Sequence, residues 1–292
     1  MIPYFPPEGG KYRLSLGLKV LAEEDWIEIG EDYEQDLIEK ARLLQEHPAQ
    51  VFQALPGSEI AQAEVVDHLK RHLVIHHPEQ FAALDIGIHN KTTGLDITPD
   101  PVAPLLSIAK LVQEDMTVLR PFEDGFRLIA ALVAFPTRWD LSVKMGKLLA
   151  DIHSPVPGYD EKLARPMDRL FAGLTDDRLL WRANYSLLDD AAMFQPGGHF
   201  KSGAGVDLTA ENIGHELWFR VERQTLRRLT GSDTIVFTVR IHQALLKDVV
   251  TTPERAADLL TATQNLPADM KRYKSLPGFE GALTDWLENR TT

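Results

Sequence analysis

Cysteine is absent from this chain of 292 residues. A thiolate is required for Cys-ligated haem, for Cys-bound iron–sulfur clusters, for zinc ribbons, for disulfides and for a cysteine nucleophile, so the chain itself can supply none of these. Any metal or haem site in it must therefore use histidine, carboxylate, tyrosine or methionine side chains.

Long apolar runs are also absent, and none approaches the roughly 20 residues that span a bilayer. The first seven residues lack the basic and apolar regions of a signal peptide. We therefore expect a soluble, cytoplasmic protein with no membrane partner. No linker-like stretch and no internal repeat interrupts the chain, which favours a single domain over residues 1–292. Phosphate-loop and dinucleotide fingerprints are missing as well.

Basic residues are fewer than acidic ones, 31 against 43, which gives a formal net charge of −12. Because nucleic acid needs a concentrated basic face, we expect no nucleic-acid partner. An acidic surface instead favours cationic substrates or a basic protein partner. A chain of this length buries roughly three quarters of its unfolded surface, which is enough to enclose a prosthetic group.

Hydrophobic periodicity divides the chain into three portions. A helical N-terminal portion, about 1–120, contains predicted helices at 32–45, 58–76 (with Ser58 as N-cap) and 101–113. A sheet-rich core, about 121–250, contains strands at 126–135 and 181–187, helices at 141–150 and 163–174, and a hairpin of 217–229 with 235–245. C-terminal helices, about 251–292, occupy 253–264 and 278–289. The predicted fold class is α+β, with helices around an antiparallel sheet.

Three histidines of the second predicted helix share one of its faces: His68, His72 and His76. Imidazoles at this i, i+4 spacing can share a metal ion. The same pattern also fits a polar helix face, because no separate cluster supplies an obvious third ligand.

His153 has a different setting, because Pro155, Pro157 and Gly158 follow it closely. Two fixed φ angles directly after the histidine hold its imidazole in one direction at little entropic cost, as an axial metal ligand requires. A histidine at a helix end beside prolines can equally be a cap or a packing residue.

The segment 217–228 carries polar residues on both faces of a predicted strand. One face holds Arg220, Glu222, Gln224 and Leu226, and the other holds Val221, Arg223, Thr225 and Arg227. Such a strand can line a polar cavity and clamp carboxylates through bidentate arginine contacts. It can also be an exposed edge strand that carries charges against aggregation.

Two adjacent carboxylates, Glu114 and Asp115, follow Gln113 at the end of the third predicted helix. They could hold an amine or relay protons. They could also be an ordinary solvated pair.

Several segments together resemble the family of haem-dependent oxidative N-demethylase alpha subunits. The principal signature runs from Phe135-Pro136 through Trp139, Leu141, Lys144-Met145-Gly146, Leu149 and Ile152-His153 to Pro155-Val156-Pro157-Gly158. Further matches are Trp26–Ile29 with Asp32-Tyr33, Leu111–Asp115, Met167–Phe171, Arg182 with Asn184-Tyr185, and Arg220–Leu229. They follow the family's order over most of the chain.

The resemblance implies a haem-binding core related to PAS-type sensor domains, with an antiparallel sheet flanked by helices. It also implies that oxygen is used to oxidise a small secondary amine such as dimethylamine to a primary amine and formaldehyde. The cofactor would be haem b, and electrons would come from NADPH through flavin and iron–sulfur centres on a separate reductase protein. A chain without cysteine or a dinucleotide motif agrees with that division.

Within this family, His153 is the histidine that lies in a matched motif, so we expect it to be the axial ligand of the haem iron. We expect Arg223, with Arg182 or Arg220 in support, to pair with the haem propionates. Glu222 and Asp115 are the candidates for holding the substrate's ammonium group.

Two alternatives from other classes remain open at this point. The first is a haem-based sensor or haem-binding protein that keeps the axial histidine but has no amine turnover. The second is a non-haem metal protein that uses His68, His72 and His76.

Overall fold

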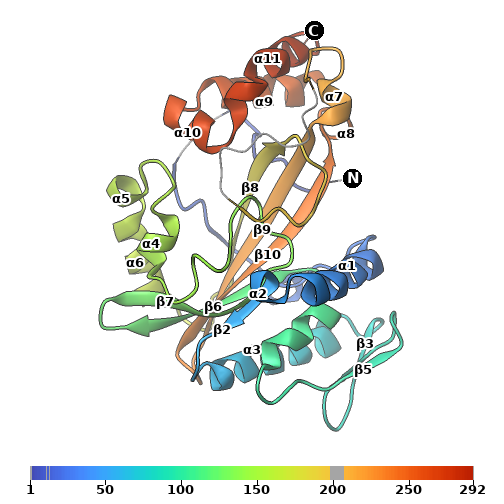
Figure 1. Ribbon diagram of the computed structural model, residues 1–292, viewed down its shortest axis with the longest axis vertical. Helices are drawn as coiled ribbons and strands as arrows, with labels where there is room; N and C mark the ends of the chain where they lie inside the picture. The colour runs from blue at the N-terminus through green and yellow to red at the C-terminus, as the bar shows by residue number, and fades with distance from the viewer. Residues whose placement is uncertain (1, 11, 13, 198–206, 292) are drawn as a thin grey trace.

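The structure is a computed structural model and describes residues 2–10, 12, 14–197 and 207–291. In this part of the chain the main feature is an antiparallel sheet with the strand order β1-β8-β9-β10-β6-β7-β2 (Figure 1). Its strands are β1 (Lys19–Val20), β2 (Phe52–Ala54), β6 (Asp115–Phe122), β7 (Gly125–Leu132), β8 (Leu180–Leu188), β9 (Trp218–Leu229) and β10 (Thr234–Leu245). The α+β class predicted from the sequence is confirmed.

Three groups of helices surround the sheet, as Figure 1 shows. At the lower end lie α1 (Tyr33–Glu46), α2 (Pro48–Val51) and α3 (Glu59–His76), with the 3-10 helices η1 (Glu23–Asp25) and η2 (Pro104–Lys110) and a small sheet of β3 (Phe81–Ala83), β4 (Ile88–Asn90) and β5 (Leu95–Ile97). To one side lie α4 (Leu149–His153), α5 (Tyr159–Lys162) and α6 (Ala164–Gly173). The upper end is covered by α7 (Ile213–Glu216), α8 (Leu246–Val249), α9 (Pro253–Gln264), α10 (Ala268–Tyr273), η3 (Leu276–Gly278) and α11 (Glu280–Glu288).

The β9–β10 hairpin is the backbone of the sheet, and the prediction of this hairpin is confirmed. Its strands pair without interruption from Trp218↔Leu245 to Leu229↔Thr234. The turn uses Asp233 in the left-handed region (φ 49°), a conformation that aspartate tolerates better than most side chains. The backbone N–H groups of Gly231 and Ser232 donate to the Glu64 carboxylate, so α3 fastens the tip of the hairpin.

Most of the predicted helices occur where the sequence places them. Helix α9 begins with Pro253 at its first position, and the Thr252 hydroxyl accepts a hydrogen bond from the Arg255 N–H at 3.3 Å. Helix α3 follows Ser58 as predicted, but the Ser58 hydroxyl donates to the Leu55 carbonyl and does not cap the helix.

Three predictions need correction. Residues 142–146 form turns, Leu148 forms a β-bridge with Arg127, and only α4 at Leu149–His153 is helical in that region. The predicted helix at 101–113 shrinks to η2, because Leu111 leaves the helix and the chain enters a strand that the sequence reading missed, β6. The N-terminal portion is not purely helical, since it contains β1, β2 and most of β6 from the main sheet. It also contains β3–β5, which form a second sheet.

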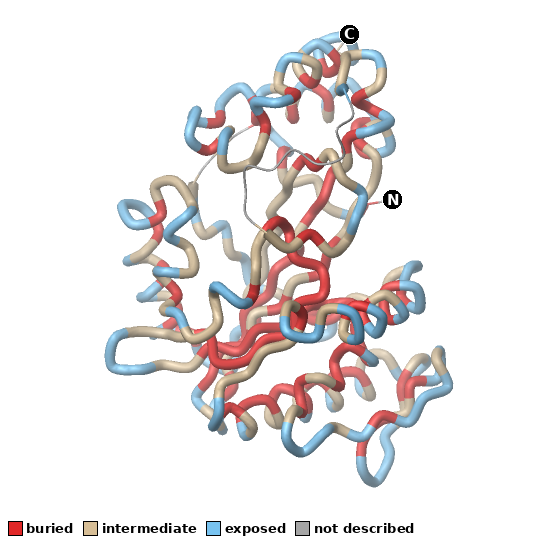
Figure 2. The backbone as a smooth tube through the Cα atoms, viewed as in Figure 1, coloured by how far each residue is buried: buried red, intermediate tan, exposed pale blue. Residues whose placement is uncertain are grey.

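The two faces of β9 meet different surroundings, as its alternating pattern predicts. Glu222, Gln224 and Leu226 face a large cavity. On the opposite face, Arg223 and Arg227 reach the segment around η1. Figure 2 shows that the middle of the sheet is buried where the helical groups cover it, so charged side chains on both faces lie in the interior and need partners.

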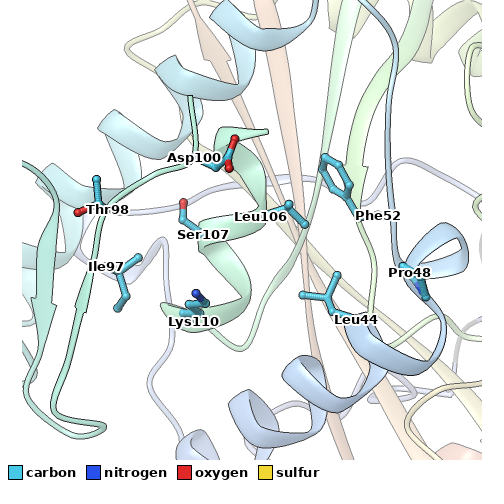
Figure 3. Close-up of a pocket in the computed structure, with 9 residues that line it drawn as sticks. All are labelled: Leu44, Pro48, Phe52, Ile97, Thr98, Asp100, Leu106, Ser107 and Lys110. Carbon is cyan, nitrogen blue, oxygen red and sulfur yellow. The ribbon is translucent and has the colours of Figure 1, made fainter. Parts of the chain in front are cut away.

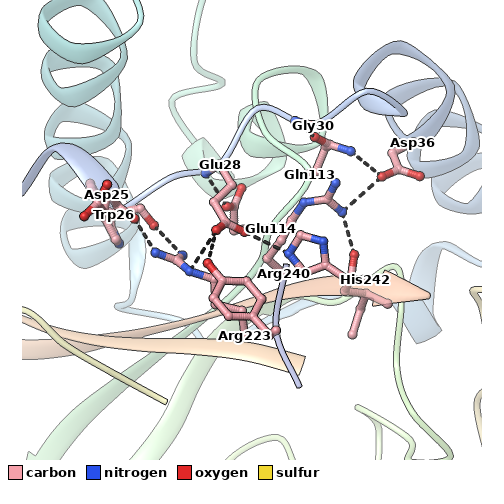
Figure 4. Close-up of polar contacts among 12 residues, drawn as sticks. Asp25, Trp26, Glu28, Gly30, Asp36, Gln113, Glu114, Arg223, Arg240 and His242 are labelled. Carbon is pink, nitrogen blue, oxygen red and sulfur yellow. Dashed lines mark hydrogen bonds and ion pairs between the residues drawn. The ribbon is translucent and has the colours of Figure 1, made fainter. Parts of the chain in front are cut away.

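The face away from the cavity holds a buried network of ion pairs (Figure 4). Arg223 donates to the Trp26 carbonyl at 3.1 Å and lies 3.2 Å from the Glu28 carboxylate. His242 contacts the other oxygen of Glu28 at 2.9 Å, and Arg240 pairs with Asp36 at 3.2 Å. These contacts fix the extended segment 25–36 against the sheet.

Lys40 and Asp115 form a second buried pair, at the start of β6. The Lys40 ammonium is fully buried, lies 3.1 Å from Asp115 Oδ1 and donates to the Glu114 carbonyl at 2.6 Å. Asp115 also accepts from the backbone N–H groups of Ala134 (3.0 Å) and Phe135 (2.8 Å). The aspartate therefore anchors the chain as it leaves β7 toward the cavity.

We predict that Lys40→Met lowers the free energy of unfolding by about 3–5 kcal/mol, because it leaves the Asp115 charge buried without its cation. The measurement is urea unfolding followed by circular dichroism. Lys70→Met is the control, since the Lys70–Asp67 pair at 3.1 Å lies at the surface and should change stability by no more than about 1 kcal/mol. Equal losses in the two variants would show that the buried pair adds nothing special.

Candidate functional site

A cavity of about 810 Å³ lies between the sheet, the α4–α6 group and α10. Its floor is formed by β6, β8, β9 and β10, and one wall is the N-terminal segment of Tyr12 and residues 14–18. Most of its lining is apolar, including Leu128, Phe135, Trp139, Met167, Phe171, Leu226 and Phe237. A volume of this size lies within the range of about 300–1,000 Å³ that small-molecule and cofactor sites occupy.

His153 is part of this lining, at the C-terminal end of α4. Its Nδ1 lies 2.8 Å from the Leu149 carbonyl, which requires that Nδ1 carries the proton. The other nitrogen, Nε2, then has a free lone pair. Burial lowers the pKa of His153 to about 4, with Lys144 and Arg182 nearby also opposing a positive charge, so the ring is neutral at pH 7.

The turn after α4 fixes the direction of this ring. Gly158 adopts a left-handed conformation (φ 72°), which favours glycine. A β-carbon at this position would also lie only 3.2 Å from the Leu14 side chain. The turn allows α5 to begin at Tyr159, whose ring stacks on His153 with centroids 5.0 Å apart and planes 11° apart. The segment of Pro155, Pro157 and Gly158 thus brings Tyr159 against His153 as a packing partner.

Four cationic side chains also line the cavity: Arg138, which pairs with Asp189, and Lys144, Arg182 and Lys274. Burial lowers the pKa of Lys144 to about 8 and that of Lys274 to about 8, and the negative charge of Glu222 counteracts both shifts. Burial also lowers the pKa of Arg182. Buried cations of this kind are stabilised by an anion in the same cavity.

Glu222 and Arg182 are joined through Gln224. The Arg182 Nε donates to Gln224 Oε1 at 2.7 Å, and Gln224 Nε2 donates to Glu222 Oε2 at 2.8 Å. Arg182 also donates to the Leu16 carbonyl at 3.2 Å, which ties the N-terminal wall to the sheet. This chain of hydrogen bonds determines the orientation of the Gln224 amide and holds Glu222 at the cavity surface.

The structure brings His153, Arg182, Glu222 and Asp115 to one cavity. The Asp115 carboxylate is already engaged by Lys40 and two backbone N–H groups, which leaves it poorly placed to accept a further partner.

Arg220 and Arg223 do not reach the cavity. Arg220 is fully buried and donates to the carbonyls of Phe135 and Met193 at 2.8 and 3.0 Å. Arg223 lies on the opposite face of the sheet, where it is held by Trp26 and Glu28. Because strand alternation places Arg223 and Glu222 on opposite faces, these two residues cannot serve the same ligand.

Lys144, Lys274 and Gln224 were missed as site residues in the sequence analysis. Lys144 stood inside the quoted signature, nine residues before His153, and its place in that motif was a usable signal. Strand alternation placed Gln224 on the same face as Glu222, so the contact between these two side chains could have been predicted. Lys274 lies in a C-terminal segment whose return to the cavity nothing in the sequence indicates.

A smaller pocket of about 430 Å³ lies between α1, β2 and η2 (Figure 3). Its charged lining residues are Asp100 and Lys110. The Asp100 carboxylate accepts from the backbone N–H groups of Val102 and Ala103 at 2.7 and 2.9 Å, which occupies it in turn formation. This pocket therefore lacks the ligand and acid–base groups of the large cavity. Among the described residues, no helix has the length and apolar character to cross a membrane.

The fold and the cavity define an α+β protein with one neutral imidazole and several cations around an internal cavity. The family model described as "Haem-dependent oxidative N-demethylase, alpha subunit-like" matches residues 17–284. The chain belongs to this family, and the resemblance found in the sequence is confirmed. The family's name implies dependence on haem.

The burial of His153 predicts a pH dependence for the haem-free protein. The pKa of His153 lies near 4 in the folded state, below its ordinary value of 6.5, so the unfolded chain binds the proton more tightly. Stability is therefore lost as the pH falls from about 6.5 to 4. His153→Gln should remove up to roughly 3 kcal/mol of that loss.

Urea unfolding at several pH values between 7 and about 4 measures this effect. His215→Gln, at an exposed position, is the control and should retain the wild-type slope. An unchanged slope in His153→Gln would contradict a buried neutral imidazole.

Proposed function

We propose that the large cavity binds haem b and that His153 is the axial ligand of its iron. The observation that carries this proposal is the hydrogen bond from His153 Nδ1 to the Leu149 carbonyl, which leaves Nε2 as the donor atom in the cavity lining. Iron-bound histidine commonly donates its other ring N–H to a carbonyl or carboxylate, which fixes the tautomer and the ring direction. The apolar lining and the volume of about 810 Å³ fit a flat, largely hydrophobic ligand.

The haem propionates would pair with Arg182, Lys144 and Lys274. These three cations outnumber Glu222, the carboxylate that counteracts their pKa shifts, so this group of four has a surplus of positive charge. Two propionates would offset that surplus and relieve the desolvation of the cations. Arg182 takes the role that the sequence analysis gave primarily to Arg223. We also infer that the sheet is related to PAS-type sensor domains.

The proposed reaction is oxidative N-demethylation of a small secondary amine. For dimethylamine, one oxygen molecule, two electrons and two protons convert the amine to methylamine, formaldehyde and water. Bound haem supplies the oxidising chemistry with oxygen, and the N–CH₃ carbon is the atom that is oxidised. The electrons come from NADPH through a separate reductase that carries flavin and iron–sulfur centres, which this chain cannot bind through cysteine.

Within this reaction the chain binds and orients the amine. Glu222 would pair with the ammonium group, since a cation taken out of water needs a partner of opposite charge. Gln224 holds Glu222 in position through the 2.8 Å hydrogen bond. The surrounding apolar side chains exclude bulk water.

We predict that His153→Ala abolishes most haem binding, because it removes the only bond from the chain to iron that the proposal contains. Haem content is measured from the Soret absorbance after reconstitution with hemin and gel filtration. His215→Ala is the control and should bind haem as the wild type does. Retention of a normal haem spectrum by His153→Ala would refute the ligand assignment.

We predict that Glu222→Gln raises the Michaelis constant for the amine by at least about tenfold, or abolishes turnover, while haem content is retained. Formaldehyde release is measured with reductant, oxygen and a panel of methylamines. Glu216→Gln, at an exposed position on α7, should behave as the wild type. Haem and oxygen binding by the wild type without formaldehyde from any amine would favour a haem-based sensor instead.

A further inference from the structure

A second cluster of ligand-type side chains lies outside the cavity, between η1 and α3. Glu23, His72 and His76 each place one ligand atom so that all three atoms lie within 4.8 Å of one another. Glu23 Oε1 is 3.7 Å from His72 Nδ1, and the rings of His72 and His76 are 4.7 Å apart. Ligand atoms around a tetrahedral zinc ion, each about 2.0–2.1 Å from the metal, are separated by roughly 3.4 Å. A small side-chain adjustment therefore suffices to bring the three together around an ion.

His72 is the member that its surroundings leave unsatisfied. The residue is 3% exposed, and within the described part of the chain neither ring nitrogen has a hydrogen-bond partner. Buried imidazole nitrogens almost always have such partners, so a buried ring with two unsatisfied nitrogens calls for an explanation. Burial, with His76, His77 and Arg227 close by, lowers the pKa of His72 to about 3. The ring is thus neutral, which is the form that binds metals.

Glu23 is oriented by a separate contact. Its Oε2 pairs with the Arg227 guanidinium, which itself lies over the Trp26 ring at 4.4 Å. The pairing leaves Oε1 directed at His72, and a partner that fixes a carboxylate in this way is typical of atoms behind a metal site. Arg227 also brings a positive charge near the cluster, which weakens cation binding. The Glu23 side chain is 50% exposed, so an ion can reach the site from solvent.

We propose that Glu23, His72 and His76 form a binding site for a divalent transition metal, with Zn²⁺ as the expected ion and water in the remaining position. Two imidazoles and one carboxylate are a ligand set that zinc accepts, and the absence of thiolates makes softer ions less suited. His68, which shares the helix face in the sequence, is not part of the site, because it faces Glu64 at 4.0 Å. The third ligand comes from η1, far away along the chain.

The proposed ion would connect η1 to α3 directly. Residues just after Glu23 supply the carbonyls of Asp25 and Trp26 to Arg223, so a bond at Glu23 also holds the segment that covers the far face of the sheet. The site and His153 lie on opposite faces of the sheet. Metal binding here is therefore independent of haem binding in the cavity.

The test is a titration of the purified full chain with zinc chloride, after treatment with a chelator, by isothermal calorimetry. The wild type should bind one Zn²⁺, and the midpoint of thermal unfolding should rise with zinc concentration because the ion binds the folded state. His76→Gln and Glu23→Gln should each weaken binding at least about tenfold. Both positions are partly or largely exposed, so the variants should fold.

His68→Gln is the matched control on the same helix and should bind zinc as the wild type does. His153→Ala should also keep zinc affinity, which separates this site from the proposed haem site. The proposal is overturned if the wild type binds no zinc, if His76→Gln and Glu23→Gln bind it unchanged, or if His68→Gln loses as much affinity as His76→Gln.

Discussion

Charged side chains buried on both faces of one sheet set the main constraint on this structure. A buried guanidinium without partners is costly, so Arg220, Arg223 and Arg240 each require more oxygen atoms than the strands supply. Strand β10 offers Gln243 Oε1 to Arg220 and the Ile241 carbonyl to Arg240. The chain provides the others from segments remote in sequence: the carbonyls of Phe135 and Met193 for Arg220, residues 25–28 for Arg223, and Asp36 for Arg240. These hydrogen bonds and ion pairs position much of the irregular backbone around the sheet.

The two faces of the main sheet differ in how their buried charged side chains are neutralised. On the face covered by residues 25–36, Arg223 pairs with Glu28 and Arg240 pairs with Asp36 (Figure 4). On the cavity face burial lowers the pKa of Lys144 and of Lys274, and the negative charge of Glu222 opposes both shifts. Under our proposal, an anionic ligand in the cavity would offset the desolvation of these two lysines.

The sequence predicted the elements whose signals are local. The β9–β10 hairpin, α1, α3 and α9 follow from periodicity and capping, and strand alternation correctly divided Glu222 from Arg223. Strand β6 escaped because its pattern, Asp115 to Phe122, opens on a charged residue whose partner, Lys40, lies on a distant helix. Strand alternation separates Arg223 from Glu222, but it does not say which of the two faces meets the cavity. That Lys274 reaches the cavity depends on how a distant segment packs, on which periodicity carries no information. His153 could be selected from the sequence because two prolines and a glycine constrain the backbone directly after it.

The cavity has walls from both ends of the chain. Tyr12 and residues 14–18 form one side, and Met270, Tyr273 and Lys274 of the α10 region form another. Strand β1, which follows the N-terminal wall in the chain, pairs with β8, and α10 follows β10. Because these two walls come from opposite ends of the chain, removal of either end would open the apolar lining of the cavity to water.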